Sequence, residues 1–174
     1  MSKNYPDVPV NMSEWTHMQG GRDKGMDSAL VTANVMYEDL SVLNVISWQH
    51  WIAVSEVNYC DGLIYINLDD KTFEMTKRYY VTGNFSKYVP TGSVRVDAAC
   101  DDPELRLLAF KYDGGCAVIV INSTEKEKEL SLPEQYSAVK SAVTDDNNNL
   151  CEYDIAAPEH IKITPRSVTT IILR

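Results

Sequence analysis

The sequence of 174 residues lacks the features of several common protein classes. No apolar run approaches the roughly 20 residues that a membrane-spanning helix needs, which argues against a membrane span. Lys and Arg number 16 against 25 Asp and Glu, giving a net charge of -9. Because nucleic-acid affinity depends on Lys and Arg, this balance argues against a nucleic-acid partner. Residues 1–10 contain no apolar stretch of the kind found in secretory signals.

Motifs for metal, thiol, serine and phosphate chemistry are also missing. No C-x-x-C pair occurs among the four widely spaced cysteines, and buried thiols are expected at Cys60, Cys100, Cys116 and Cys151. Metal-ligand spacing is lacking among the three histidines, His17, His50 and His160. There is no G-x-S-x-G elbow, G-x-G-x-x-G turn or P-loop. The sequence therefore predicts no metal and no cofactor, and carboxylate chemistry remains.

The hydrophobic period of the chain changes near residue 90. Before this point, strand-like runs alternate with helical patterns; the runs are 8–12, 45–48 and 63–66, and the helical patterns are 26–43 and 77–88. This alternation is typical of βα units around a parallel sheet. We therefore expect the helix at 26–43 to pack on the short parallel strands.

After Pro90 the apolar residues recur with period two, as in half-buried strands. The predicted strands are 94–98, 105–112, 116–122, 127–132, 136–143, 150–155, 160–163 and 167–173. Asp113-Gly114-Gly115 is a strong hairpin signal between two of them. The fold class predicted is α/β followed by all-β, with an α/β unit at 1–89 and an antiparallel β-sandwich at 90–174, packed as separate units.

One carboxylate, Glu14, follows a predicted parallel strand, where the loops of an α/β barrel form its active face. Trp15 is adjacent, and the next strand carries Trp48-Gln49-His50-Trp51. Indole rings beside carboxylate and amide groups suit a sugar, which stacks its C–H face and hydrogen-bonds through its hydroxyls. The alternative for each tryptophan is that it fills a core, and for Glu14 that it is solvated or salt-bridged.

Several segments resemble glycoside hydrolase family 30. Ser13-Glu14-Trp15 is similar to the nucleophile motif of that family. Further similarity lies in the eighth barrel strand, the segment after it, the last barrel helix and the sandwich; the matching segments are Val45–Trp51, Asp61–Ile64, Lys77–Gly92, Val94–Ala98 and Pro165–Thr170. The strongest of these matches is Lys77–Gly92, which carries Lys-Arg-Tyr-Tyr, Phe-Ser and the closing Pro-x-Gly in order.

The resemblance implies that 1–89 is the C-terminal part of a (β/α)8 barrel, its last two βα units, and that 90–174 is the attached sandwich. It implies a retaining hydrolase of β-linked glycans in which Glu14 is the nucleophile. A carbohydrate-binding subsite is implied for Trp15, His17, Trp48, Gln49 and His50. The parent enzymes of this family are secreted or periplasmic, and their substrates include xylans, β-1,6-glucans, β-1,6-galactans and glucosylceramide.

The sequence departs from the family in its second carboxylate. Retaining hydrolysis uses two carboxyl groups about 5 Å apart, and the acid/base Glu of the family follows an Asn. No Asn-Glu pair occurs here. A complete barrel takes about 250 residues, so the chain is expected to lack strands one to six and to be inactive alone. Glu56 is the alternative residue for the acid/base role, but we do not expect it to act as one, because its loop follows the segment that resembles the eighth barrel strand.

Two other functions remain open. The residues from 90 onward could form a non-catalytic carbohydrate-binding or interaction module, although they contain no tryptophan. The chain could also be the product of a truncated reading frame with no independent function.

We expect the chain expressed alone to self-associate, because two βα units cannot close a barrel and leave strand edges and apolar faces exposed. Size-exclusion chromatography with light scattering tests this prediction. A monodisperse monomer that melts cooperatively would contradict it.

Overall fold

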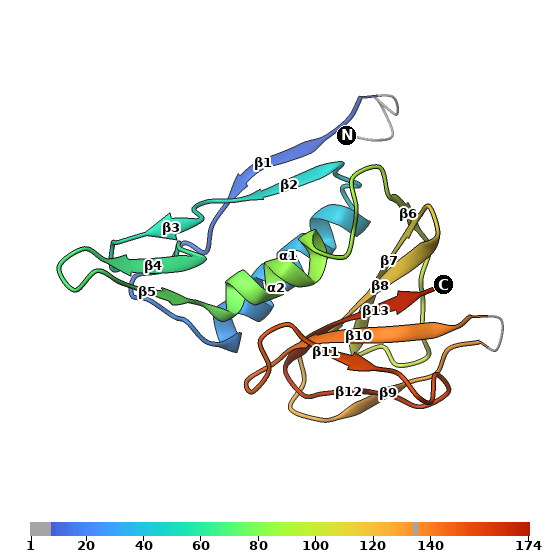
Figure 1. The fold of residues 1–174 in the computed structure, drawn as a ribbon. Helices are drawn as coiled ribbons and strands as arrows, with labels where there is room; N and C mark the ends of the chain where they lie inside the picture. The colour runs from blue at the N-terminus through green and yellow to red at the C-terminus, as the bar shows by residue number, and fades with distance from the viewer. Residues whose placement is uncertain (1–7, 134–135) are drawn as a thin grey trace.

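The computed structural model describes residues 8–133 and 136–174, which form mostly strands, in several sheets, and two helices (Figure 1). The first half contains β1 (Asn11–Trp15), α1 (Met26–Ser41), β2 (Ser47–His50), β3 (Val54–Ser55), β4 (Ile64–Asn67), β5 (Thr72–Met75) and α2 (Lys77–Ser86). The second half contains β6 (Val94–Val96), β7 (Leu105–Tyr112), β8 (Gly115–Asn122), β9 (Lys128–Leu130), β10 (Ala138–Thr144), β11 (Cys151–Asp154), β12 (Ile161–Ile163) and β13 (Ser167–Leu173).

The predicted elements are largely confirmed, with two clear displacements and two omissions, β3 and β5. Helices α1 and α2 each begin where predicted and end two residues early, while β7 and β13 match to the residue. The first strand is 11–15 rather than 8–12, and the second is 47–50 rather than 45–48. The sequence analysis missed β5, because all four of its residues are exposed and no buried face marks the strand.

Four sheets organise these strands. The largest has the order β11-β10-β13-β8-β7-β6, and its neighbours are all antiparallel. A two-stranded sheet, β12-β9, packs on part of one face of the six-stranded sheet. The six-stranded sheet therefore has an apolar core on each of its two faces. β1 and β2 form a parallel pair, and β3-β4-β5 form a small mixed sheet. Figure 1 shows β1 and β2 on one side of the helix pair and the six-stranded sheet on the other.

The two helices share a core with the six-stranded sheet rather than packing mainly on the short parallel strands. That core contains Met26, Ala29, Leu30, Ala33 and Met36 of α1, Val81 and Phe85 of α2, and Leu108, Phe110, Ile119, Ile121 and Val168 of the sheet. From the parallel pair, only the partly buried Trp48 joins it. The reason is area, because a six-stranded sheet offers a far larger apolar face than two strands, and burial scales with area.

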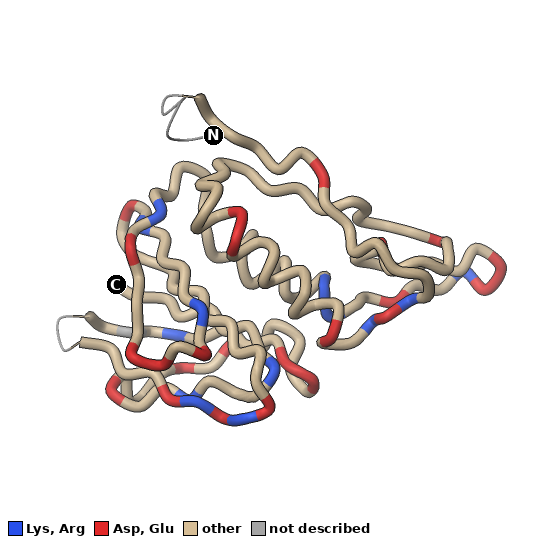
Figure 2. Tube along the Cα trace, turned by 180° about the vertical axis from the view of Figure 1, so that it is seen from behind, with Lys and Arg blue, Asp and Glu red and all other residues tan. Residues whose placement is uncertain are grey.

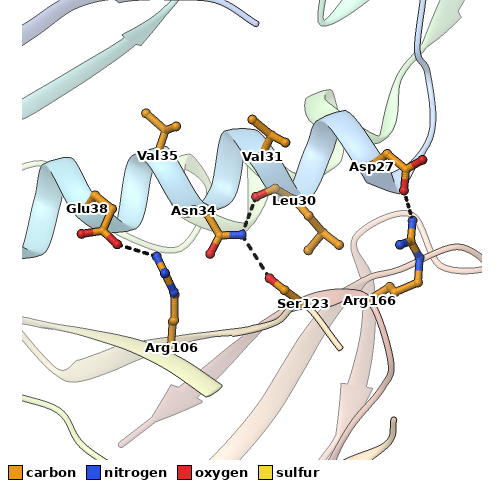
Figure 3. Close-up of a pocket in the computed structure, with 9 residues that line it drawn as sticks. All are labelled: Asp27, Leu30, Val31, Asn34, Val35, Glu38, Arg106, Ser123 and Arg166. Carbon is orange, nitrogen blue, oxygen red and sulfur yellow. Dashed lines mark hydrogen bonds and ion pairs between the residues drawn. The ribbon is translucent and has the colours of Figure 1, made fainter. Parts of the chain in front are cut away.

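Polar contacts tie α1 to the same sheet along its length. Figure 3 shows Arg106 of β7 paired with Glu38, the amide of Asn34 donating to Ser123 Oγ, and Arg166 paired with Asp27. The distances are 2.6, 3.0 and 2.5 Å, in that order. These pairs are largely exposed and add little stability individually. Their arrangement sets the direction of α1 over the sheet.

Asn84 of α2 makes the corresponding buried connection. Its amide donates to the Ala142 carbonyl at 2.9 Å and to Thr170 Oγ1 at 3.1 Å, and its Oδ1 accepts from Thr144 Oγ1 at 2.7 Å. The side chain is fully buried. One amide therefore joins α2 to both β10 and β13.

Charged residues of both signs are spread along the described part of the chain (Figure 2). Figure 2 shows Lys and Arg interspersed with Asp and Glu along the trace. Neither helix is long and apolar enough to cross a membrane, over the part of the chain that the structure describes.

Replacing Asn84 by Ala should lower the free energy of unfolding by about 2–3 kcal/mol, because Thr144 and the Ala142 carbonyl lose a buried partner. Denaturant unfolding of dilute protein measures this change. The control is Asn58→Ala, since Asn58 is exposed. Equal stability of the two variants would show that the Asn84 connection does not hold the helix to the sheet.

Candidate functional site

The parallel pair β1–β2 carries the candidate site. Asn11 lies opposite Ser47 and Met12 opposite Trp48, after which the register shifts so that Trp15 lies opposite His50. β1 therefore contains one more residue than β2 over this stretch, a β-bulge beside Glu14. The ladder continues beyond both strands, because the Trp51 N–H donates to the Trp15 carbonyl at 2.8 Å.

Four aromatic rings gather on one face of this pair. The centroids of Trp15 and Trp48 are 5.8 Å apart, and those of Trp15 and His17 are 6.5 Å apart. His50 lies 6.2 Å from both tryptophans. We call Trp15, His17, Trp48 and His50 the aromatic cluster. Its rings face the helices, because Trp48 Nε1 donates to Asp39 Oδ2 of α1 at 2.8 Å.

Glu14 and Gln49 belong to the opposite, exposed face, which we call the open face. Neighbouring residues of a strand point to opposite sides, so Glu14 alternates with Trp15, and Gln49 alternates with Trp48 and His50. Both side chains are exposed. The structure thus brings together four of the six predicted site residues and separates Glu14 and Gln49 from them.

Trp51 is the residue that the predicted subsite omitted. It follows β2 with the alternation of Gln49, and 53% of its surface is exposed. Its neighbour Trp48, by contrast, is partly buried against the main core. The sequence alone does not indicate whether Trp48 or Trp51 faces solvent. This depends on which side of the strand the helices cover.

The two histidines of the cluster rest on the segment Cys60–Gly62. His50 Nε2 lies 2.8 Å from the Asp61 carbonyl oxygen, and His17 Nδ1 lies 3.7 Å from Cys60 Sγ. Burial lowers the pKa of His50 below its ordinary value, so the imidazole is neutral near pH 7. A neutral His50 then donates from Nε2 to the Asp61 carbonyl.

The remaining predicted residues are placed as follows. Glu56 is exposed in the loop after β3, and its backbone carbonyl accepts from Arg22. Cys60 is buried as expected, whereas Cys100, Cys116 and Cys151 are half-buried, and all four are free thiols. No cluster of His, Cys, Asp and Glu able to hold a metal ion occurs in the described part of the chain.

The site lies within a stretch that matches a known family. The family model described as O-Glycosyl hydrolase family 30 matches residues 11–65, which include β1, β2 and the loops after them. Lysosomal acid glucosylceramidase of Mus musculus is 27% identical over 126 residues, 66% of this chain and 23% of its own length.

Solved structures extend the similarity to the whole fold. The family 30 subfamily 8 xylanase Xyn30A from Clostridium acetobutylicum superposes with a TM-score of 0.78 at 20% identity, covering 99% of this chain and 44% of the xylanase. A conserved exported protein from Bacteroides fragilis gives a TM-score of 0.84 at 20% identity, over 98% of this chain and 40% of that protein. The chain thus spans about a quarter of the curated relative and less than half of these solved structures.

The fold is similar to part of the fold of these solved structures. The family match, the curated relative and the solved xylanase all support the resemblance to glycoside hydrolase family 30, and the chain aligns with only part of each of these proteins.

The neutral state of His50 predicts a pH dependence of stability. Its pKa is lower in the folded than in the unfolded chain, so its contribution is present above about pH 6.5 and is lost as pH falls below that value. Denaturant unfolding at a series of pH values should show this acid-side decline, and His50→Gln should reduce it.

The matched control is His160→Gln. Its hydrogen bond to Glu129 raises the pKa of the exposed His160, so this residue stabilises the fold below about pH 6.5 and the effect is lost at higher pH. Removing it should make the acid-side decline steeper. An unchanged pH profile in His50→Gln would contradict the assignment.

Proposed function

We propose that this chain is the nucleophile-bearing part of a retaining glycoside hydrolase that acts on β-linked glycans or glycosides. Residues 1–89 would be the last two βα units of a (β/α)8 barrel, and 90–174 the attached β-sandwich. The supporting observation is that Glu14 lies on the open face near the carboxyl end of the parallel strand β1. Active sites of (β/α)8 barrels lie at that end of the strands.

In this proposal Glu14 attacks the anomeric carbon, and the glycosyl–enzyme ester formed is hydrolysed by water. The leaving oxygen needs a proton from a second carboxyl group about 5 Å from the first. The chain has no Asn-Glu pair of the kind that carries this group in the family. We therefore expect little or no turnover by the chain alone.

The open face suggests how a sugar would bind. The exposed indole of Trp51 offers a stacking surface, and the Gln49 amide beside it offers a donor and an acceptor for hydroxyl groups. Trp15, His17, Trp48 and His50 would support this face from behind, through the strands, rather than form the floor of the subsite. Their role in the subsite is thus indirect in this proposal.

The substrate class and location follow from the relatives. The relatives include xylanases, a glucosylceramidase and an endo-β1,6-glucanase, names that indicate carbohydrate or glycolipid substrates. The protein from Bacteroides fragilis is described as exported. We propose a carbohydrate substrate and a secreted or periplasmic parent enzyme.

A chimera tests this function. The chain from β1 onward would replace the corresponding C-terminal part of Xyn30A, which then supplies the rest of the barrel and the second carboxyl group. The chimera should hydrolyse xylan, and Glu14→Gln should lower its kcat by about 10⁴-fold or more, the loss typical for a removed covalent catalyst. Glu56→Gln is the matched control and should retain activity.

Two further variants separate the catalytic proposal from a carbohydrate-binding module in the sandwich. On the proposed site, Trp51→Ala should weaken glycan binding and Trp48→Ala should chiefly lower stability. A binding module predicts instead that residues 90–174 retain glycan and that Trp51→Ala binds as the parent does. Full activity of Glu14→Gln in the chimera would refute the nucleophile assignment.

A further inference from the structure

Arg78, in the first turn of α2, is fully buried, and no carboxylate pairs with it among the described residues. Its guanidinium instead donates to uncharged groups, namely the carbonyls of Asp23 and Gly62 at 2.6 and 2.7 Å, Tyr65 Oη at 3.1 Å, Cys60 Sγ at 3.2 Å and Ser28 Oγ. A buried charge without a counter-ion is costly, so such an arrangement persists only where several well-placed acceptors satisfy it.

Three of these acceptors belong to two different loops, while Ser28 lies in α1 and Tyr65 in β4. Asp23 lies in the loop between β1 and α1, whereas Cys60 and Gly62 lie in the segment between β3 and β4. These loops also meet through their backbones, because Cys60 N donates to the Gln19 carbonyl at 2.9 Å. Arg78 thus joins the chain that follows Glu14 to the chain that follows Trp51.

The same segment supports the aromatic cluster. The Asp61 carbonyl contacts His50, and Cys60 Sγ lies beside His17. Asp61 also accepts from Ile52 N at 3.1 Å, directly after the exposed Trp51. Any displacement of Cys60–Gly62 is therefore transmitted to both histidines and to the end of β2.

The segment has little freedom apart from this anchor. A side chain at Gly62 would come within 2.9 Å of Ser55 Cβ and 3.0 Å of the Ile64 carbonyl. Tyr65 Oη closes the arrangement, since it donates to the Tyr59 carbonyl and accepts from Gly62 N. Close packing of this kind turns the removal of one anchor into a shift of the whole segment.

We propose that Arg78 is a positioning residue, whose forked guanidinium holds together the loop after β1 and the segment between β3 and β4, and thereby sets the placement of His17, His50 and Trp51 behind and beside the proposed nucleophile. The catalytic half of this statement rests on the proposed function. The geometric half does not. A lysine is not equivalent, because its ammonium lacks the planar fork. In Arg78 one nitrogen of the fork, Nη1, donates to Asp23 and Cys60, while the other, Nη2, donates to Gly62 and Tyr65.

Histidine hydrogen–deuterium exchange read by mass spectrometry tests the geometric half in the full chain and needs only dilute protein. In Arg78→Lys the positive charge remains but the fork is lost, so His17 and His50 should exchange faster and the pKa of His50 should move toward its ordinary value. His160, on the far sheet, is the internal reference and should not change.

Asn84→Ala is the matched control, because it weakens the fold without touching either loop. It should leave the exchange of His17 and His50 at the parent value under folding conditions. Where Arg78→Lys fails to fold, Ser28→Ala removes a single acceptor and should shift both histidines less, in the same direction. Parent-like histidines in Arg78→Lys, or equal shifts in Asn84→Ala, would overturn the proposal.

The chimera with Xyn30A tests the catalytic half. There Arg78→Lys should lower kcat by about tenfold to a hundredfold, the loss expected for a small misplacement of reacting groups, and leave KM nearly unchanged. An inactive parent chimera with shifted histidines would defeat the proposed function and leave the anchoring role intact. An active chimera whose kcat is unaffected by Arg78→Lys would defeat the positioning role alone.

Discussion

The burial of one face of the six-stranded sheet under α1 and α2 is the constraint on which the rest of the structure depends. It supplies the main apolar core, and it is completed by the buried amide of Asn84. Once the helices lie on this sheet, their opposite sides face β1 and β2, which are too few to form a core alone. The parallel pair is therefore separated from the six-stranded sheet by the two helices, which contact both. Trp48, bonded to Asp39 of α1, is the side chain that makes this attachment.

This layering explains why the predicted site divides into two parts. A strand that lies over helices must bury one face, and the aromatic cluster occupies that face. Glu14 and Gln49 are left on the other, where the bulge beside Glu14 allows Trp15 to stay on the buried side. The arrangement suits a carboxylate that must reach substrate, because its support is rigid while the group itself remains accessible. In the proposed function, this exposed carboxylate on a firmly held strand would form one half of an active site.

The sequence was sufficient to predict most helices and strands and to identify Glu14 as a candidate site residue. It was insufficient to predict how these elements pack on one another. The sequence located β7 and β13 to the residue, because both are long apolar runs bounded by turn residues, with Asp113-Gly114 after β7 and Pro165 before β13. It missed β5, whose residues are all exposed, and it gave the helices the wrong principal partner. The spacing of apolar residues indicates that a helix has a buried face. It does not indicate which other element packs against that face, because this depends on contacts between residues far apart in the sequence. Arg78 was noted only as part of a similar segment, since nothing local indicates that a basic residue in a first turn is fully buried.

The distribution of exposed apolar side chains bears on what the proposed half-site lacks. Ile46, Leu68 and Phe73 are each about two-thirds exposed, at 68, 67 and 69%, and all lie in residues 1–89. In the six-stranded sheet, by comparison, the long strands β8 and β13 bury nearly every position. Apolar side chains are therefore well buried in the six-stranded sheet and poorly buried around β1, β2 and the small mixed sheet. Those are the elements that carry Glu14, Gln49 and Trp51. In the proposed function, the rest of a (β/α)8 barrel would supply both the apolar surface that buries these apolar side chains and the second carboxyl group that the chemistry needs.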